Sequence, residues 1–417
     1  MRETHSLSNE GTRLSDKNTS EDVSGRVRPF VRYVGYIMMA LVSFSVCEVL
    51  AYAYLRTFEG YDGVHLMNYE FDDYKNVRPT PNYVNTRGVY HNAQGFRHRG
   101  DVSKDKSPGT YRVFIMGGST GYGLQSLSAA AQKQFPVITN EETIDHYLQL
   151  YLNREVSGGR VEVINAAITS QQSHHHLIYL NQTVLKYRPD MVIFIDGFND
   201  YYTYWKNFDQ FRDYAYQQRA QTFLLEPTMN AWAEYTGWWL FRKSHFIHVA
   251  ARTLRPIGVK IMSIGGERFR IDVEEALWNL QENADNNFVK MVERNALILR
   301  NENITPIFTL QPEIVLRQSK PFTDLEKEIF KEMDTVWEIN YVEYKNKARP
   351  IVVEKLAKAT AKAGALFLDL TDIYGGMQET AYTDYCHLTP EGNKWLAEYL
   401  GAKLLPIIKE KLQAARS

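Results

Sequence analysis

The sequence predicts an α/β fold in which a parallel β-sheet lies between two layers of helices. Five short apolar runs, rich in β-branched and aromatic residues, are typical of buried strands, and longer segments with a helical pattern separate them. This alternation is typical of a parallel sheet covered on both faces, and 417 residues are enough for one large domain or two. The predicted strands are Tyr111–Met116, Val161–Ile164, Met191–Ile195, Pro306–Leu310 and Ala365–Leu368. The predicted helices are Thr143–Leu152, His175–Lys186, Glu275–Arg300, Ile351–Ala363 and Pro390–Leu412.

An apolar segment near the N-terminus, Val34–Leu55, predicts a transmembrane helix. Its 22 residues carry a single charge, Glu48, and a helix of this length spans about 30 Å of hydrocarbon. Three arginines closely precede the segment and Arg56 alone closely follows it, so the positive-inside rule predicts a cytoplasmic N-terminus and an extracytoplasmic remainder. The polar residues 1–33 are expected to form a disordered cytoplasmic tail. A cleaved signal peptide and a buried core helix are the alternatives.

The rest of the chain divides into a linker and one large domain. Residues 56–106 are predicted to be irregular, and residues 107–412 are predicted to form the α/β domain. Between about residues 201 and 266 the strand–helix pattern fails and aromatic residues accumulate, which indicates an inserted helical subdomain that buries them. A cap over the site, or a surface that rests on the membrane or binds a glycan, is the alternative. The tryptophans of this insert are Trp205, Trp232, Trp238 and Trp239.

The charge and the cysteine content argue against two classes of protein. With 48 Lys plus Arg against 49 Asp plus Glu, the chain lacks the basic surplus of a nucleic-acid-binding protein. Its two cysteines, Cys47 and Cys386, can form one bridge at most, and Cys47 lies in the apolar segment, so no disulfide framework is expected. Nothing in the sequence predicts a cofactor, a metal or a nucleic-acid partner.

A glycine-rich turn follows the first predicted strand. The sequence GGSTG, Gly117–Gly121, lacks the lysine of a nucleotide-binding Walker loop, and its glycines have the reverse of the dinucleotide-binding spacing. It matches the Gly-x-Ser-x-Gly pattern, in which a serine is lifted clear of the sheet at a sharp strand-to-helix turn. Ser119 is therefore a candidate nucleophile, and its backbone N–H at a helix start favours negative charge. A plain glycine-rich turn is the alternative.

A serine nucleophile needs a base, and His387 is the candidate. Asp384 precedes it by three residues, so one turn of chain can hold the carboxylate against one ring nitrogen and leave the other nitrogen free. An isolated surface Asp–His pair is the alternative. The run His174–His176 is expected to start a helix with one or two exposed imidazoles, because consecutive helical residues point in different directions and make a poor metal cluster.

Two more strand ends carry polar groups. The segment NAAITSQ, which contains Ser170, follows the second predicted strand, and Gly-Phe-Asn-Asp, which contains Asn199, follows the third. An asparagine at a strand end can donate a hydrogen bond to a developing oxyanion. The chemistry of a parallel α/β sheet gathers at the carboxyl ends of its strands, so these groups are expected at the same edge as Ser119 and His387.

These four segments, in this order, resemble the SGNH (GDSL-type) hydrolase family in its membrane-anchored bacterial type. The resemblance covers roughly residues 111–405 and implies a three-layer, flavodoxin-like fold. It also implies a catalytic triad and an oxyanion hole. The triad would consist of Ser119, His387 and Asp384, and the hole of the backbone N–H groups of Ser119 and Ser170 with the side-chain amide of Asn199.

Two positions depart from the family pattern. Gly118 stands where an aspartate is usual, and Ser170 stands where a glycine is usual. The backbone N–H of residue 170 is available as a donor whatever side chain the residue carries, although a serine there narrows the pocket. The segment NAQGFR, Asn92–Arg97, resembles one that precedes the nucleophile block in membrane-anchored relatives, and structural packing is its expected role.

The resemblance implies a membrane-anchored serine esterase on the extracytoplasmic side of the membrane. Its partner would be an ester-bearing substrate, such as an acylated cell-envelope glycan or lipid. An O-acyltransferase, in which a sugar hydroxyl replaces water, is one alternative. A non-catalytic glycan-binding or assembly module is the other.

Overall fold

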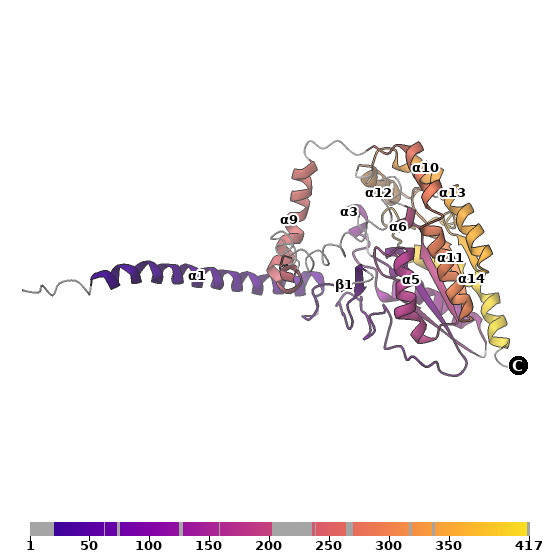
Figure 1. The fold of residues 1–417 in the computed structure, drawn as a ribbon, viewed down its shortest axis with the longest axis horizontal. Coiled ribbons are helices and arrows are strands. Elements are labelled where there is room, and N and C mark those ends of the chain that lie inside the picture. Colours follow the sequence, from indigo (N-terminus) through magenta and orange to yellow (C-terminus); the bar gives the residue numbers. More distant parts are fainter. Residues whose placement is uncertain are drawn as a thin grey trace, which may run out of the picture.

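A five-stranded parallel sheet lies at the centre of the computed structural model (Figure 1). The structure describes residues 21–414, apart from 62, 73–75, 125–127, 158, 202–235, 238, 264–269, 317–318 and 336–337. The strand order is β4-β3-β5-β6-β7, which is the flavodoxin-like order 2-1-3-4-5 when counted from β3. The strands span Thr110–Gly117 (β3), Arg160–Asn165 (β4), Met191–Asp196 (β5), Thr305–Leu310 (β6) and Leu366–Asp369 (β7). All five predicted strands are confirmed, each to within one residue at either end.

The central strands of the sheet are apolar on both faces. Ile115 of β3 pairs with Ile193 of β5 and with Asn165 at the end of β4, and the side chains of β5 are all buried. Strands that helices cover on both sides carry continuous apolar runs, which is why the sequence shows runs here and no alternation. Because β3 is flanked by β4 on one side and β5 on the other, the connection from β3 to β4 and the connection from β4 to β5 run in opposite directions along the sheet. Such a reversal opens a crevice at the carboxyl end of the strand.

Helices cover both faces of the sheet. On one face α4 and α14 pack together, and on the other α5, α11 and α13 form a continuous layer (Figure 1). Crossovers between parallel strands are right-handed in nearly all proteins, and the reversal of strand order at β3 then places helices on both faces. These helices span Ile144–Glu155 (α4), Ser173–Gln182 (α5), Phe288–Asn301 (α11), Tyr341–Lys362 (α13) and Pro390–Ala414 (α14).

Several predicted helix boundaries are wrong. The segment predicted as one helix, Glu275–Arg300, is two helices, because a polar turn interrupts it between α10 (Val273–Asn283) and α11. The helix predicted to reach Lys186 ends at Gln182 and is followed by a 3₁₀ turn. Helix α13 begins ten residues before its predicted start and continues through Pro350. Helix α12 (Asp324–Asp334) was not predicted.

The N-terminal helix projects from the sheet domain (Figure 1). Helix α1 spans Glu21–Tyr54 and continues as a π-helical turn, Leu55–Glu59. It is long and apolar enough to cross a membrane between Val31 and Glu59, and only 6% of its most apolar window is buried. The alternative of a buried core helix is therefore wrong. Residues 21–33, predicted to belong to a disordered tail, are helical, and residues 1–20 lie outside the described part.

The linker and the insert contain short ordered elements. An antiparallel hairpin forms within the segment predicted to be irregular, from β1 (Tyr69–Asp72) to β2 (Asn76–Pro79). Most of the predicted insert, including Trp205, Trp232 and Trp238, lies outside the described residues. Its described end contains α9 (His245–Ser263), which packs against α1 (Figure 1).

Candidate active site

Ser119 lies at the turn from β3 into the short helix α2 (Ser119–Tyr122). At Gly117 the backbone has a φ of 149°, and a Cβ there would lie 2.1 Å from the carbonyl oxygen of Ile195 in the neighbouring strand. A strand backbone cannot move aside, so this turn requires glycine at position 117. The turn leaves Ser119 half-buried at the carboxyl edge of the sheet.

A chain of short hydrogen bonds joins Ser119, His387 and Asp384. The Nε2 atom of His387 lies 2.8 Å from Ser119 Oγ, and its Nδ1 lies 2.7 Å from Asp384 Oδ2. The other carboxylate oxygen, Oδ1, accepts hydrogen bonds from the backbone N–H groups of Cys386 at 3.0 Å and His387 at 2.9 Å. A carboxylate fixed on one ring nitrogen leaves the other nitrogen to exchange a proton with a serine. The structure thus brings together the three residues that the sequence predicts as a triad.

Burial and charge act on His387 in opposite directions. Burial alone lowers its pKa, but the hydrogen-bonded Asp384 carboxylate raises it, and the pKa of His387 lies well above its ordinary value of 6.5. This environment stabilises the imidazolium that forms when the ring takes a proton. Burial also raises the pKa of the adjacent Cys386 thiol, so the thiol stays neutral near pH 7.

Asn199 lies beside the serine turn, in the short helix α6 (Phe198–Tyr201) that follows β5. Its side-chain Nδ2 donates to the backbone carbonyl oxygen of Gln171 at 2.8 Å, and the backbone carbonyl oxygen of Asn199 accepts from Gln172 Nε2 at 2.7 Å. A Cβ at Gly118 would lie 2.6 Å from this Nδ2, so the amide occupies the space that a side chain at position 118 would need. One hydrogen bond orients the amide, and its second N–H can serve a ligand at the edge of the sheet.

Ser170 is exposed and adopts a left-handed backbone conformation, with a φ of 61°. Glycine adopts this conformation without strain, which accounts physically for the glycine that the resembled family has at this position. The next residue, Gln171, is the one that holds the Asn199 amide. Ser170 and Asn199 therefore lie at the same edge as Ser119, where the sequence predicts them.

Arg97 fixes the C-terminal end of α2, the helix that begins with Ser119, from inside the domain. Its buried guanidinium donates from Nη1 to the carbonyl oxygens of Tyr122 at 2.9 Å and Gly123 at 2.7 Å, and from Nε to Asn140 Oδ1 at 3.0 Å. These carbonyls end the helix that Ser119 begins, and a cation is favourable at that end. The segment Asn92–Arg97 has the packing role that the sequence analysis expected, and the contact with the serine helix gives that role its reason.

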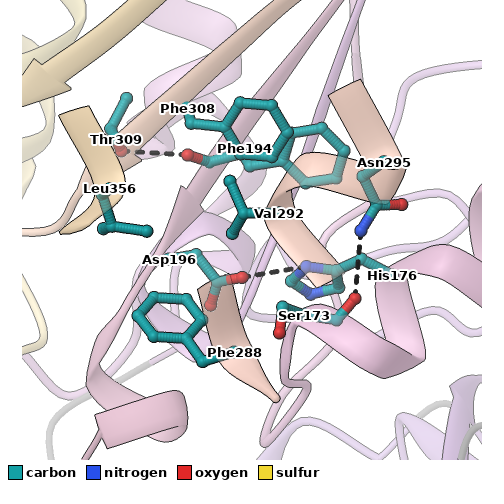
Figure 2. Close-up of a pocket in the computed structure, with 10 residues that line it drawn as sticks. All are labelled: Ser173, His176, Phe194, Asp196, Phe288, Val292, Asn295, Phe308, Thr309 and Leu356. Atoms are coloured by element: carbon teal, nitrogen blue, oxygen red, sulfur yellow. Dashed lines mark hydrogen bonds and ion pairs between the residues drawn. The ribbon is translucent and has the colours of Figure 1, made fainter. Parts of the chain in front are cut away.

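A buried cavity, lined by none of these groups, lies between the sheet and the helices α5, α11 and α13 (Figure 2). It is lined in part by His176 of α5, whose Nδ1 lies 2.9 Å from Asp196 Oδ2 at the end of β5. His174 and His175 are buried as well, so the expectation of exposed imidazoles in this run is wrong. Burial lowers the pKa of His174 to about 4 and that of His175 well below its ordinary value, which keeps both rings neutral.

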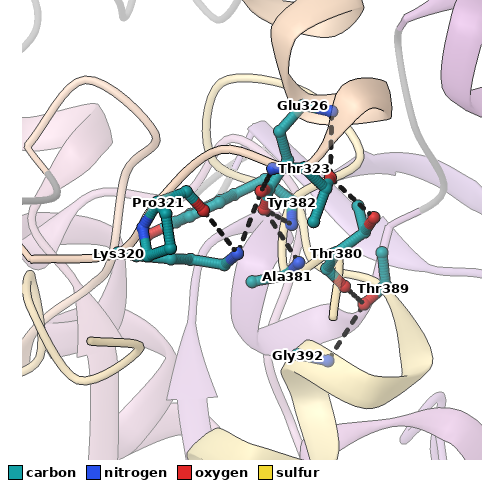
Figure 3. A network of polar contacts seen from close by, with 9 residues as sticks. All are labelled: Lys320, Pro321, Thr323, Glu326, Thr380, Ala381, Tyr382, Thr389 and Gly392. Carbon is teal, nitrogen blue, oxygen red and sulfur yellow. Dashed lines mark hydrogen bonds and ion pairs between the residues drawn. The ribbon is translucent and has the colours of Figure 1, made fainter. Parts of the chain in front are cut away.

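A buried polar network holds the loop that carries Asp384 and His387 (Figure 3). Glu326 of α12 accepts from the backbone N–H of Ala381 at 2.9 Å through Oε1, and from Lys320 Nζ at 2.9 Å through Oε2. Both side chains of this ion pair are fully buried. Glu326 lies in the helix that the sequence analysis missed, and the capping box at Thr323 is the signal that would have found it.

One group of potential metal ligands occurs among the residues that the structure describes, namely Asp384, Cys386 and His387. Both ring nitrogens of His387 already have hydrogen-bond partners, in Asp384 and Ser119. The arrangement fits proton transfer to and from a serine better than it fits metal coordination, which would displace one of those partners.

Neither a family model nor a curated protein sequence matches this chain. Among solved structures, it is similar to an acetylxylan esterase from Geobacillus stearothermophilus, at 12% identity and a TM-score of 0.34 over 70% of this chain and 92% of that one. It is also similar to a protein described as a GDSL-like lipase from Parabacteroides merdae, at 10% identity and a TM-score of 0.35 over 73% of this chain and 98% of that one. At such low identity, the chemistry of this chain must be inferred from its own side chains.

Proposed function

We propose that this chain is a membrane-anchored serine ester hydrolase of the SGNH type. The observation that best supports the proposal is the hydrogen-bonded chain from Asp384 through His387 to Ser119 at the carboxyl edge of the sheet. A serine hydroxyl is a weak nucleophile until a base takes its proton, and this arrangement provides the base and a carboxylate that orients it.

The first half of the proposed reaction forms an acyl-enzyme. Ser119 Oγ attacks the ester carbonyl carbon while His387 Nε2 takes its proton. The negative charge that develops on the carbonyl oxygen is met by the backbone N–H groups of Ser119 and Ser170 and by the second N–H of Asn199. Each such donor contributes about 3 kcal/mol to transition-state stabilisation. The C–O bond of the ester then breaks, and the departing alcohol takes the proton from His387.

The second half regenerates the serine. His387 takes a proton from water, and the resulting hydroxide attacks the acyl carbon of Ser119. When the acyl–serine bond breaks, Ser119 takes the proton back from His387 and the carboxylic acid leaves. Asp384 keeps the Nδ1 proton of His387 in place through both halves, so that Nε2 is always the atom that exchanges protons.

The position of the anchor helix supports a location for the α/β domain and a class of substrate that it would meet there. Helix α1 presents exposed apolar side chains from Val31 to Tyr54, as a lipid-facing helix does. The arginines before it favour a cytoplasmic N-terminus, which puts the α/β domain on the extracytoplasmic side. An acylated glycan or lipid of the cell envelope is the ester that a domain held there would meet.

The test is hydrolysis of p-nitrophenyl acetate by the full-length protein in detergent micelles. Ser119→Ala and His387→Ala should each lower kcat by at least about 10⁴-fold. Ser103→Ala, which changes an exposed serine outside the site, is the matched control and should retain full activity. Equal activity in wild type and Ser119→Ala would disprove the proposal. A folded wild-type protein without esterase activity would favour the non-catalytic module.

A further inference from the structure

The single charge in the apolar stretch of α1 has a defined partner. The carboxylate of Glu48 accepts hydrogen bonds from the Ser244 hydroxyl, from the backbone N–H of His245 at 2.9 Å and from His245 Nδ1 at 3.0 Å. Phe44, one helical turn earlier on α1, packs edge-to-face against Phe246 with ring centroids 6.0 Å apart. Glu48 and Phe44 therefore fix the first turn of α9 to one face of the anchor helix.

This contact fixes the depth of α9 in a membrane that α1 spans. Glu48 precedes the end of the apolar run at Leu55 by seven residues, which is about 10 Å along a helix axis. Amphipathic helices that lie in a membrane surface sit about 5–10 Å below the headgroup boundary. Figure 1 shows α9 running across the direction of α1, so a membrane perpendicular to α1 has α9 lying along its surface.

The composition of this region suits that position. From residue 239 to residue 263 the chain contains five Lys or Arg residues and no Asp or Glu. Within its described side chains, Trp239, Phe246 and Leu254 are large apolar groups exposed to solvent. Basic residues beside exposed Trp, Phe and Leu are typical of a segment that binds the interface of anionic lipids. Three of the five basic residues, together with Phe246 and Leu254, belong to α9, and Trp239 lies just before it.

We propose that α9 is an interfacial helix that lies in the outer leaflet of the membrane that α1 spans and binds anionic lipid there. The inference depends on the proposed anchor and not on the proposed triad. Two ion pairs join the region to its surroundings, from Arg252 to Glu59 at the end of α1 and from Arg242 to Glu70 of the β1–β2 hairpin at 3.3 Å. The helix thus fixes the orientation of the α/β domain at the membrane surface.

Spin-label accessibility in vesicles of phosphatidylcholine and phosphatidylglycerol tests this placement. The full-length chain with Cys47→Ala has one remaining native cysteine, Cys386, which is buried and unavailable for labelling. Single cysteines then replace three residues of matched exposure: Leu254 on α9 (59%), Val42 in the anchor (59%) and Leu150 on α4 (57%). Collisions of each label with oxygen, which concentrates in lipid, are compared with collisions with a water-soluble nickel complex.

The expected result is a ratio of oxygen to nickel collisions that is several-fold higher at 254 and at 42 than at 150, with the ratio at 254 between the other two. A lipid-like ratio at 42 with a water-like ratio at 254 would overturn the inference and leave the anchor intact. A label at 254 protected from both reagents would also overturn it, because protein would then cover this face. A water-like ratio at 42 would refute the anchor itself, and the inference with it. A ratio at 254 that is equally lipid-like in vesicles of phosphatidylcholine alone would contradict the preference for anionic lipid.

Discussion

Replacing Asp384 by asparagine tests the placement of a single proton. In the structure Oδ1 of Asp384 accepts two backbone N–H groups, at 3.0 and 2.9 Å, while Oδ2 faces His387 Nδ1 at 2.7 Å. An asparagine must keep its oxygen toward the two backbone donors, because an NH₂ group there would face them without an acceptor. Its NH₂ group then faces His387 Nδ1 and makes that atom an acceptor. The ring proton moves to Nε2, which can no longer take a proton from Ser119.

The expected effect of Asp384→Asn is a loss of about 10⁴-fold in kcat, with the fold retained. At 1.36 kcal/mol per tenfold, this is about 5.4 kcal/mol of transition-state stabilisation. The assay is p-nitrophenyl acetate hydrolysis, beside Asp105→Asn, which changes an exposed carboxylate outside the site and outside the Glu326 network. Circular dichroism and the thermal midpoint show whether both variants fold. A folded Asp384→Asn protein within tenfold of wild type would refute the proton placement and the role of Asp384.

Four further predictions follow from single contacts. The raised pKa of His387 puts the acidic limb of the kcat/KM–pH profile above 6.5, because the neutral ring is the base and activity rises as the pH rises through that pKa; a limb below 6.5 contradicts this. Ser170→Gly should keep kcat, since the backbone N–H remains, and should leave the unfolding free energy equal or higher by up to about 1 kcal/mol in thermal melts. A large loss of kcat would mean that the Ser170 hydroxyl takes part. Glu326→Gln should cost about 3–5 kcal/mol of stability, since it leaves the Lys320 ammonium buried without its counter-charge, and a loss below 1 kcal/mol would show that the pair is dispensable. Arg97→Lys should lower stability by about 1.5–3 kcal/mol and lower kcat, because a lysine cannot reach the carbonyls of Tyr122 and Gly123 in the same fork geometry, and unchanged stability would refute this.

The strands of the sheet were predictable because the residues of each strand alone carry the signal that identifies it. Each strand is a short run of buried apolar residues, and a strand covered on both faces leaves that signature whatever the rest of the fold does. The contact between Asp384 and His387 was predictable for the same reason, since one turn of chain is enough to bring the two side chains together. Helix ends were less predictable. Asn287, which separates α10 from α11, and Pro350, which does not interrupt α13, show that tertiary packing decides such boundaries.

Long-range partners were not predictable from one sequence. In the sequence, Glu48 is only a charge that makes membrane insertion of the helix less favourable. Its partners Ser244 and His245 lie almost 200 residues away, in a segment without a clear strand or helix pattern. The histidines at 174–176 were predicted to be partly exposed because helical periodicity describes one helix in isolation. In the structure, α11 packs over the start of α5 and buries them. In both cases, a distant part of the chain decides whether the side chain is paired or buried.

The distance between Ser119 and His387 depends on two such long-range supports. These residues are 268 positions apart in sequence and 2.8 Å apart in space, so neither local turn can set the distance alone. Arg97 holds the end of the serine helix, and Glu326 holds the loop of the histidine. Both supports are buried charges with several hydrogen bonds, and such groups hold one geometry because any displacement leaves a charge unsatisfied in the interior. The four recognisable segments therefore carry the proposed reacting groups, and residues outside those segments fix the geometry between them.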